Sequence, residues 1–275
     1  MFGTTAQSQN SDTDAKPPYL KPRVITFAPH LAELVYAAGA GDSLVGVSEY
    51  TPKVFQRNLP IIGNAFAFDW AAIAKLKPDL ILVWGSGNSP ATQARLKALG
   101  LSTFVSEPKT LSDIVNETRA LAQQLGRASD ATSIAQLSDT LIELNRLKTQ
   151  RANKPVITVF HPIWPKPLMT INREHVINDA LNYCGAGNVF AQTAGLTPTV
   201  TSAQVLRAKP AVLLLTKKDT ETTTQAMQTW QTLLDVFPKA HRPRVVWVSG
   251  DRFHQPGPGL IPETLKLCNA LQAND

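Results

Sequence analysis

The chain has 275 residues, of which 43% are hydrophobic and 17% charged, a balance typical of a soluble globular protein with room for two domains. No apolar run reaches the roughly 18 residues that a membrane-spanning helix requires. The net charge of +6 comes from scattered lysines and arginines without interleaved aromatic residues. This pattern indicates a solvated surface and excludes a nucleic-acid interface.

The chain opens with a polar stretch rich in Ser, Thr, Asn and Asp that ends in prolines near Pro22. This composition predicts a disordered leader over residues 1–21. Such a leader follows a cleaved signal peptide or tethers an anchored domain, and a cloning remnant is the alternative. Since no basic stretch followed by an apolar one opens the chain, we expect an export signal to be absent here or already removed.

Seven apolar runs bounded by turn residues predict β-strands. They are rich in Val, Ile and Leu without strict alternation, which is typical of parallel strands buried on both faces. The runs cover residues 23–29, 43–49, 79–84, 102–107, 156–162, 211–216 and 244–250. Segments with helical spacing of apolar residues lie between them, among them residues 30–41, 91–100 and 173–187. Alternating strands and helices predict an α/β fold with mostly parallel sheets.

A different pattern separates the two halves. From about Leu111 to Arg151 the chain contains no Pro and no Gly except Gly126. Its later apolar residues form one helical stripe: Ile134, Leu137, Leu141, Leu144 and Leu147. We therefore predict a long connecting helix within a helical segment over residues 109–154. An N-terminal α/β lobe over residues 22–108 precedes it, and a C-terminal α/β lobe over residues 155–275 follows it.

One construction occurs in both halves, about 130 residues apart. WAAIAKLKPDLILVW (70–84) and SAQVLRAKPAVLLLT (202–216) each place a short amphipathic segment before Lys-Pro and an apolar run. The echo predicts the same helix–strand unit in each lobe, and local convergence on one βαβ pattern is the alternative. Since ligands of open α/β sheets bind beyond the carboxyl ends of the strands, we expect a ligand cleft between the lobes.

Aromatic and polar residues gather in the loops that follow the predicted strands. Aromatic rings offer flat apolar area, and a few polar groups fix a ligand's orientation. We expect Phe253 and Trp70 to pack the lobes instead. The candidate ligand-binding residues are His30, Tyr50, Phe66, Phe68, Trp84, Asn88, His161, Trp164, Arg252 and His254.

Sequence motifs for catalysis are missing. There is no G-x-S-x-G elbow and no Walker sequence, and the acidic residues lack recognisable acid–base partners. We therefore predict a protein that is not an enzyme and has no cofactor of its own. Three histidines at strand ends, His30, His161 and His254, could approach a metal-bearing ligand, but no close-spaced motif predicts a dedicated metal site.

The two cysteines, Cys184 and Cys268, belong to no C-x-x-C pair. Two free thiols or one disulfide are both compatible with this count. A disulfide would join the end of one helix to the C-terminal helix and contribute about 4 kcal/mol in the chain-entropy model. It would also place the protein in an oxidising compartment.

Several stretches in order resemble the periplasmic cobalamin-binding proteins of ABC importers, within the broader class III group of siderophore and haem binders. They include RVITFAPHLAELVYAAGAGDSLVGVSEYTP, AIAKLKPDLILVWGSGN, PLMTINREHVINDALNYCGAGNVFA and FHQPGPGL. The resemblance covers about 250 residues, from Pro22 to the end. It implies two Rossmann-like lobes joined by one long helix, and a monomer that captures a corrinoid and delivers it to a membrane permease without catalysis.

The resemblance also implies individual roles. Cys184 and Cys268 match paired cysteines of relatives that carry a disulfide, Tyr50 matches a tyrosine that stacks on the corrin, and Trp84 matches a cleft residue. Relatives carry a permease-docking glutamate in each lobe where this chain has Ala71 and Ala203. Tryptophans that contact cobalamin in relatives align with Ala65 and Thr197, and Phe66, Phe68 and Trp164 are candidates to compensate.

The sequence thus predicts a periplasmic protein that binds cobalamin or a related corrinoid for an ABC transporter. One alternative keeps the class and changes the ligand to haem, a siderophore or another metal chelate. A second alternative is an orphan ligand sensor or interaction protein that feeds no standard permease, which the two alanines would favour.

Overall fold

The computed structural model describes residues 21–128 and 131–273. Its first four strands form a parallel sheet in the order β2-β1-β3-β4. The next long strands form a second parallel sheet in the order β10-β9-β5-β8. A short antiparallel hairpin of β6 and β7 extends from the second half. The bounds are β1 (Val24–Thr26), β2 (Leu44–Gly46), β3 (Leu80–Trp84), β4 (Thr103–Ser106), β5 (Ile157–Phe160), β6 (Trp164–Pro165), β7 (Leu168–Met169), β8 (Ala186–Asn188), β9 (Val212–Lys217) and β10 (Arg244–Ser249).

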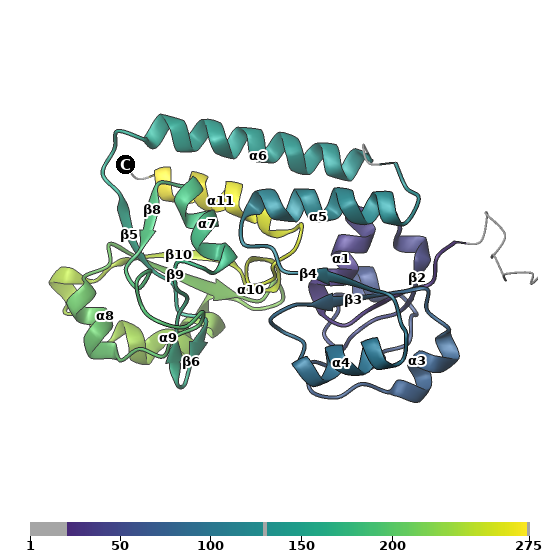
Figure 1. Cartoon of the computed structure of the whole chain (residues 1–275). Helices are drawn as coiled ribbons and strands as arrows, with labels where there is room; N and C mark the ends of the chain where they lie inside the picture. Colours follow the sequence, from purple (N-terminus) through teal and green to yellow (C-terminus); the bar gives the residue numbers. More distant parts are fainter. Residues whose placement is uncertain (1–20, 129–130, 274–275) are drawn as a thin grey trace, which may run out of the picture.

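The two four-stranded sheets have one topology. If the strands of each sheet are numbered along the chain, both run in the order 2-1-3-4, and the carboxyl ends of the two sheets face each other across the middle of the molecule (Figure 1). The parallel α/β fold expected from the sequence is therefore confirmed. All seven predicted strands are present, whereas β8 and the β6–β7 hairpin were not predicted.

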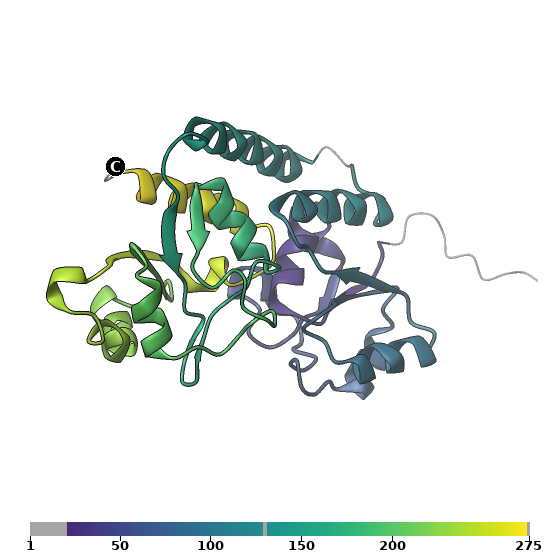
Figure 2. The same ribbon diagram turned by 60° about the vertical axis from the view of Figure 1, so that its left-hand side comes forward.

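The helices cover both faces of each sheet. They are α1 (Pro29–Ala37), α2 (Lys53–Gln56), α3 (Trp70–Leu76), α4 (Pro90–Ala98), α5 (Leu111–Gln124), α6 (Thr132–Arg151), α7 (Val176–Tyr183), α8 (Ser202–Ala208), α9 (Thr223–Leu234), α10 (Gly250–Phe253) and α11 (Leu260–Gln272), with single 3-10 turns at Gly41–Ser43 and Lys239–His241. The 20-residue α6 is the predicted connecting helix, and it lies along one side of both lobes (Figures 1 and 2). None of the helices in the described residues is long and apolar enough to cross a membrane.

The repeated construction occupies equivalent places in the two sheets. α3 leads into β3 and α8 leads into β9, and each of these is the third strand of its sheet. Each helix has seven residues and ends at a lysine in the left-handed conformation, Lys77 at φ 44° and Lys209 at φ 46°. The following proline prevents the helix from continuing. The repeated sequence construction therefore forms the same helix–strand unit in both sheets, which share one topology.

One hydrophobic core runs through both lobes. Leu31 of α1, Leu144 of α6, Leu181 of α7 and Leu267 of α11 all belong to it and are almost fully buried. The opposite face of each sheet has a smaller core of its own. Between the lobes, the Leu111 backbone N–H also donates to the Asp179 carboxylate at 2.9 Å. The shared core fixes the two sheets in one relative orientation.

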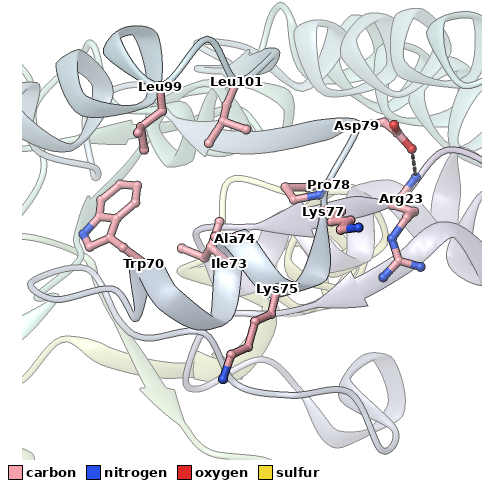
Figure 3. A pocket seen from close by; sticks show the side chains of 10 residues that line it. All are labelled: Arg23, Trp70, Ile73, Ala74, Lys75, Lys77, Pro78, Asp79, Leu99 and Leu101. Carbon is pink, nitrogen blue, oxygen red and sulfur yellow. Dashed lines mark hydrogen bonds between the residues drawn. The ribbon is translucent and has the colours of Figure 1, made fainter. Parts of the chain in front are cut away.

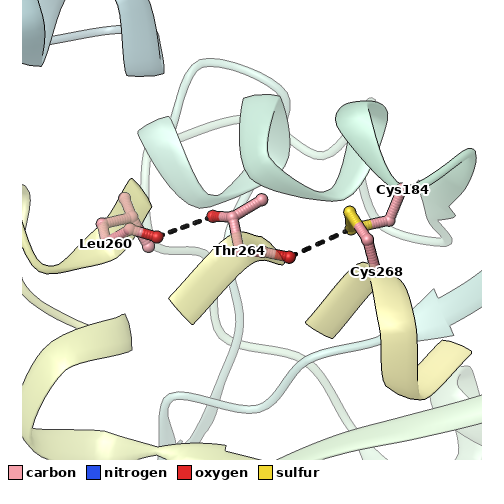
Figure 4. The surroundings of a disulfide bond; sticks show 4 residues. All are labelled: Cys184, Leu260, Thr264 and Cys268. Atoms are coloured by element: carbon pink, nitrogen blue, oxygen red, sulfur yellow. Dashed lines mark hydrogen bonds between the residues drawn. A yellow bond between two sulfur atoms is a disulfide. The ribbon is translucent and has the colours of Figure 1, made fainter. Parts of the chain in front are cut away.

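The predicted disulfide is present between Cys184, at the end of α7, and Cys268 of α11 (Figure 4). It closes a separation of 84 residues. The Cys184 sulfur lies 3.6 Å from the Thr264 carbonyl oxygen, and this is a contact only, because a disulfide sulfur has no hydrogen to donate. The bond fastens the C-terminal helix to the helical layer of the second lobe.

The domain boundaries at residues 108 and 154 stay predictions. The strands of the two sheets fall on either side of them, between Val24 and Ser106 and between Ile157 and Ser249. The predicted disordered leader lies almost entirely outside the described residues.

Candidate ligand-binding site

A cleft of about 730 Å³ lies between the two lobes at the carboxyl ends of their strands. Its N-terminal wall comes from the start of α1 and from the loop and helix α2 after β2. Its C-terminal wall comes from the segments after β9 and β10. The lining residues are Pro29, His30, Glu33, Tyr50, Thr51, Pro52, Lys53, Val54, Phe55, Asp219, Gly250, Asp251, Arg252 and Gln255. Its position is the one expected for a ligand site in paired parallel sheets.

Tyr50 has unusual exposure and an unusual backbone. Its side chain is 81% exposed, and its φ of 64° lies in the left-handed region that residues with a side chain seldom adopt. Strained backbone of this kind is concentrated at functional sites, where the surrounding structure holds it in place. Here it presents a free aromatic ring to the cleft.

His30 forms part of the cleft wall and is 2% exposed. Its ring packs edge-to-face on Trp84, with 5.2 Å between the ring centroids. Neither ring nitrogen makes a hydrogen bond of normal geometry in the described part of the chain. Burial lowers the pKa of His30 to about 3, against smaller opposite effects of Gln255 and Glu107. The neutral imidazole is therefore buried at the cleft wall, between the Trp84 ring and the side chain of Gln255.

The charges at the cleft include more carboxylates than cations. Glu33, Asp219 and Asp251 line it, opposed by Lys53 and Arg252. Burial raises the pKa of Glu33, although the Gly259 N–H and the nearby guanidinium pull it back. The Asp219 side chain accepts from Ser249 Oγ at 2.7 Å, and Asp251 accepts from the Asp219 backbone N–H at 2.9 Å. These bonds hold two carboxylates at the C-terminal wall, with the Arg252 guanidinium 4.0 Å from Asp219.

Asn88 was expected to contact the ligand, and its side chain is instead used inside the lobe. Its Oδ1 accepts from the Trp84 backbone N–H at 2.7 Å, and its Nδ2 donates to the Phe27 carbonyl at 3.2 Å. With 2% exposure it positions the end of β3. The Ser86 N–H is likewise committed, to the Glu107 carboxylate at 2.6 Å. The loop over residues 85–88 is a turn that supports Trp84.

His161 is not among the residues that line the cleft. It is fully buried, and its Nδ1 lies 2.8 Å from the Leu214 carbonyl, so this nitrogen carries the proton. Its Nε2 is then free to accept from His254 Nε2 at 3.2 Å. Both nitrogens of His161 have partners within the protein, and its contact with a ligand or with cobalt stays a prediction. His254 is its half-buried partner and does not line the cleft.

The remaining predicted aromatics fall into two groups. Phe66 is 98% exposed and Trp164, on the β6–β7 hairpin, is 58% exposed, so both rings are free for a partner or ligand. Phe68 stacks on Phe27 with 4.0 Å between the centroids and belongs to the core behind the first sheet. Phe68 is only partly buried, and its contact with a ligand stays a prediction. Phe253 is fully buried, as expected.

The two alanines at the positions where relatives carry docking glutamates lie on the surface. Ala71 and Ala203 are both exposed on the first turns of α3 and α8. In the described residues, no three His, Cys, Asp or Glu side chains lie close enough together to hold a metal ion.

Sequence reasoning did not select several residues of the cleft wall. Lys53, Asp219, Asp251 and Gln255 line it, but none of them is an aromatic residue or a histidine, the residue types that marked most candidates. The sequence indicated Glu33 only through its three-residue spacing from His30, which places both residues on one helix face. Their shared signal is position, because each lies just beyond a strand or at the first turns of the helix that follows.

The chain is similar in sequence and fold to known proteins of one family. The family described as "Periplasmic binding protein" matches residues 24–233. The vitamin B12-binding protein of Vibrio cholerae serotype O1 is 31% identical over 259 residues, which are 93% of this chain and 91% of that protein. The corresponding protein of Pectobacterium atrosepticum is 32% identical over 259 residues, 90% of this chain and 88% of that one.

Solved structures give the same result. The periplasmic vitamin B12 binding protein BtuF of Vibrio cholerae superposes with a TM-score of 0.76 at 30% identity, covering 92% of this chain and 97% of that one. A periplasmic haem-binding protein from Pseudomonas aeruginosa also reaches a TM-score of 0.76, at 18% identity and with 91% and 92% coverage, and shares the fold alone. The chain belongs to the periplasmic binding protein family.

Proposed function

We propose that this protein captures cobalamin or a related corrinoid in the periplasm and delivers it to the membrane permease of an ABC importer, without a catalytic step. The observation that carries the proposal is the relationship to proteins named for vitamin B12 binding, at 31% identity over 93% of the chain. The haem-binding neighbours reach only 16–20% identity and support the fold.

The charge of the cleft supports a corrinoid over haem. Three carboxylates and two cations line it, and Asp219 and Asp251 are exposed. Haem carries two carboxylates, and like charges at short range cost free energy that a neutral ligand avoids. A corrinoid carries amide side chains, which both donate to carboxylates and accept from Arg252 or His30. Haem, a siderophore or another chelate is therefore the second candidate.

The binding mode follows from exposure. Tyr50 and Arg252 approach the ligand from opposite lobes, and His30, which packs on Trp84, forms part of the wall. Phe66 and Trp164 have free rings that cover the outer part of a large planar ligand. Since the lobes share one core, we expect the ligand to enter a preformed cleft with little closure.

The location and the partner belong to the same proposal. A disulfide across 84 residues is stable in an oxidising compartment, which supports the periplasm. The exposed Ala71 and Ala203 replace the docking glutamates that the resemblance implies, and they favour an orphan ligand sensor as the candidate of another class. Pull-down with a corrinoid permease separates the two, because an orphan sensor binds corrinoid and recovers no permease.

Titration calorimetry with cyanocobalamin, cobinamide and haem tests the proposed ligand. We expect a single site for the corrinoids and at least ten-fold weaker binding of haem. No heat and no spectral change with either corrinoid would reject the proposal, and tighter binding of haem would transfer it to the second candidate.

Paired variants then test the cleft. Tyr50→Ala removes an exposed ring from the cleft wall, and we expect corrinoid affinity to fall at least ten-fold. Ile142→Ala removes a 67% exposed apolar side chain from α6 and is the matched control, with unchanged affinity. Equal corrinoid affinity of the two variants would show that the inter-lobe cleft is not the binding site.

A further inference from the structure

The hollows of the surface differ in whether they reach the inter-lobe cleft. The hollow of about 660 Å³ where α3 ends and β3 begins belongs to the first lobe, and none of its described lining residues lines the cleft (Figure 3). A hollow of about 500 Å³ between α1 and α6 and one of about 380 Å³ between β10 and α11 each share residues with the cleft. Arg252 lines the cleft and both of these hollows, so its side chain lies where three spaces meet.

The Arg252 guanidinium is exposed and loosely paired with carboxylates of its own lobe. Its Nε lies 4.0 Å from Asp219 Oδ2, and its Nη1 lies 4.0 Å from Glu263 Oε1. Both distances exceed the roughly 2.7–3.2 Å of a hydrogen bond. Glu263 Oε1 already accepts from Lys266 Nζ at 2.7 Å. The charges around Arg252 therefore orient the guanidinium while its N–H groups stay able to bond a ligand.

A third carboxylate near Arg252, that of Glu33, comes from the other lobe. Glu33 lies on α1, is half-buried, and lines the cleft and the hollow between α1 and α6 together with Arg252. Burial raises the pKa of Glu33, while the Gly259 backbone N–H and the charge of Arg252 act in the opposite direction. Opposite charges attract more strongly where water is partly excluded. Glu33 and Arg252 therefore form an electrostatic link between the two lobes.

The segment after Arg252 packs directly on α1. It has the sequence Gln-Pro-Gly-Pro-Gly over residues 255–259. A Cβ added at Gly257 would lie 3.1 Å from His30 Cβ, and one added at Gly259 would lie 2.9 Å from Glu33 Oε1. Gly259 is the N-cap residue of α11 and has no side chain to cap it. Since a carboxylate is stabilising near a helix N-terminus, Glu33 supplies from the first lobe an acceptor that Gly259 itself lacks.

We propose that Glu33 is a positioning residue for ligand binding, whose carboxylate, held at the start of α11, directs the Arg252 guanidinium of the opposite lobe toward the ligand in the cleft. The proposal rests on the proposed function, because it takes a corrinoid as the ligand that Arg252 meets. The amide oxygens of a corrinoid are acceptors for the guanidinium N–H groups.

A double-mutant cycle on cyanocobalamin affinity distinguishes positioning from direct contact of Glu33 with the ligand. Glu33→Gln keeps the shape of the side chain and removes its charge. We expect affinity to fall about ten-fold in the chain that retains Arg252 and by about two-fold or less in the Arg252→Gln chain, where no guanidinium is left to direct. An equal loss in both chains, or no loss in either, would overturn the proposal.

Glu117→Gln is the matched control. Glu117 is another half-buried glutamate whose pKa is raised by burial, and it accepts from the Glu107 backbone N–H at 3.1 Å. It lies on α5 and is not among the residues that line the cleft. We expect unchanged cyanocobalamin affinity, and a loss equal to that of Glu33→Gln would overturn the proposal by attributing the effect to any buried glutamate.

Gly259→Ala disturbs the same contact without changing Glu33, and it tests the proposal even if Glu33→Gln does not fold. The φ of −63° at Gly259 suits alanine, and the added Cβ displaces the flexible carboxylate end of Glu33. We expect cyanocobalamin affinity to fall about five-fold when Arg252 is present and to stay unchanged in the Arg252→Gln chain. Unchanged affinity in the presence of Arg252 would contradict the positioning role.

The Arg252 Nε–H signal in NMR spectra of the ligand-free chain gives a second readout that needs no corrinoid. Glu33→Gln should shift this signal, and Glu117→Gln should leave it in place. An unshifted signal in Glu33→Gln would overturn the proposal. A chain that binds no corrinoid but shows the shift would reject the proposed ligand and still support the positioning of Arg252 by Glu33.

Discussion

The Nε2 atoms of His161 and His254 lie 3.2 Å apart, and one proton between them is all that this arrangement accommodates. His161 Nδ1 already donates to the Leu214 carbonyl, so His254 must donate and His161 must accept. Two charged rings would place two donors face to face, and burial lowers the pKa of each ring, which disfavours a charge on either. The pair is therefore neutral in the folded protein.

This pair makes stability depend on pH. Burial lowers the pKa of His161 to about 3, with the charge of His254 adding to the shift, and burial lowers the pKa of His254 to about 4. His175 falls to about 4 and His30 to about 3, again through burial first. Since the folded chain binds fewer protons than the unfolded chain below about pH 6.5, the free energy of unfolding decreases as the pH falls from there toward 4.

Between pH 7.5 and pH 5, we expect each fully buried histidine to lower the free energy of unfolding by about 2 kcal/mol. Urea unfolding at these two values measures the total. His254→Gln should reduce the loss, whereas His241→Gln, at an exposed histidine, should leave it unchanged. Equal stability of the unmodified chain at both values would contradict the neutral pair.

Loss of the disulfide should destabilise the protein without abolishing ligand binding. Opening the loop of 84 residues frees the unfolded chain, which corresponds to about 4 kcal/mol in the chain-entropy model. The measurement is urea unfolding of the Cys184→Ser/Cys268→Ser variant beside the oxidised protein. Since the bond lies in the helical layer away from the cleft, corrinoid affinity should change less than two-fold, and a larger change would show that the bond shapes the site.

Gly63 should not accept a side chain. Its φ is 131°, and an added Cβ would lie 2.2 Å from the Ala67 carbonyl oxygen. The loop it starts presents Phe66 and is held by Asn64, whose Oδ1 accepts from the Phe66 and Ala67 backbone N–H groups. We expect Gly63→Ala to lower the free energy of unfolding by about 1–3 kcal/mol.

Thermal unfolding measures this effect, with Gly250→Ala as the control. An added Cβ at Gly250 meets its nearest atoms at 3.4 Å, in an ordinary backbone conformation. If Phe66 contacts the ligand, Gly63→Ala also weakens corrinoid binding. Normal corrinoid affinity with lowered stability would show that Phe66 does not contact the ligand. It would still agree with the expectation that a side chain at Gly63 destabilises the loop.

Neutralising the cleft carboxylates should change ligand preference. Asp219→Asn with Asp251→Asn removes two negative charges from the wall. In water, each of these charges repels a nearby carboxylate of the ligand by about 1 kcal/mol. We expect haem affinity to rise several-fold and cyanocobalamin affinity to stay within two-fold, by absorbance titration. Asp139→Asn, on the exposed face of α6, is the control. A rise of the same size in the control would attribute the change to net charge alone.

Much of the fold could be predicted because parallel strands and long helices carry strong local signals. The stripe from Ile134 to Leu147 predicted α6, and Lys-Pro marked the end of each short amphipathic segment, whereas the left-handed conformation of the two lysines was not predicted. β8 was missed because Ala186–Asn188 has no apolar run and pairs only along β5. The hairpin with Trp164 was missed because prolines surround two strands of two residues each.

The site was harder to predict because residue type does not reveal direction. His161 and Asn88 follow strands in the same way as Tyr50 does, yet their side chains turn inward to satisfy backbone groups. Phe66 and Phe68 are two residues apart and have opposite fates, one free and one stacked on Phe27. These differences arise from contacts between distant segments, which spacing along the chain does not encode.

The bond from Cys184 to Cys268 fastens the last helix, and that helix also packs against α6, the element that joins the lobes. In the oxidised chain α11 cannot peel away from the end, although chain termini usually fray first. Reduction removes this restraint and leaves α11 held by packing alone. The rate at which a carboxypeptidase shortens the chain therefore reports whether the Cys184–Cys268 bond is formed in a given preparation.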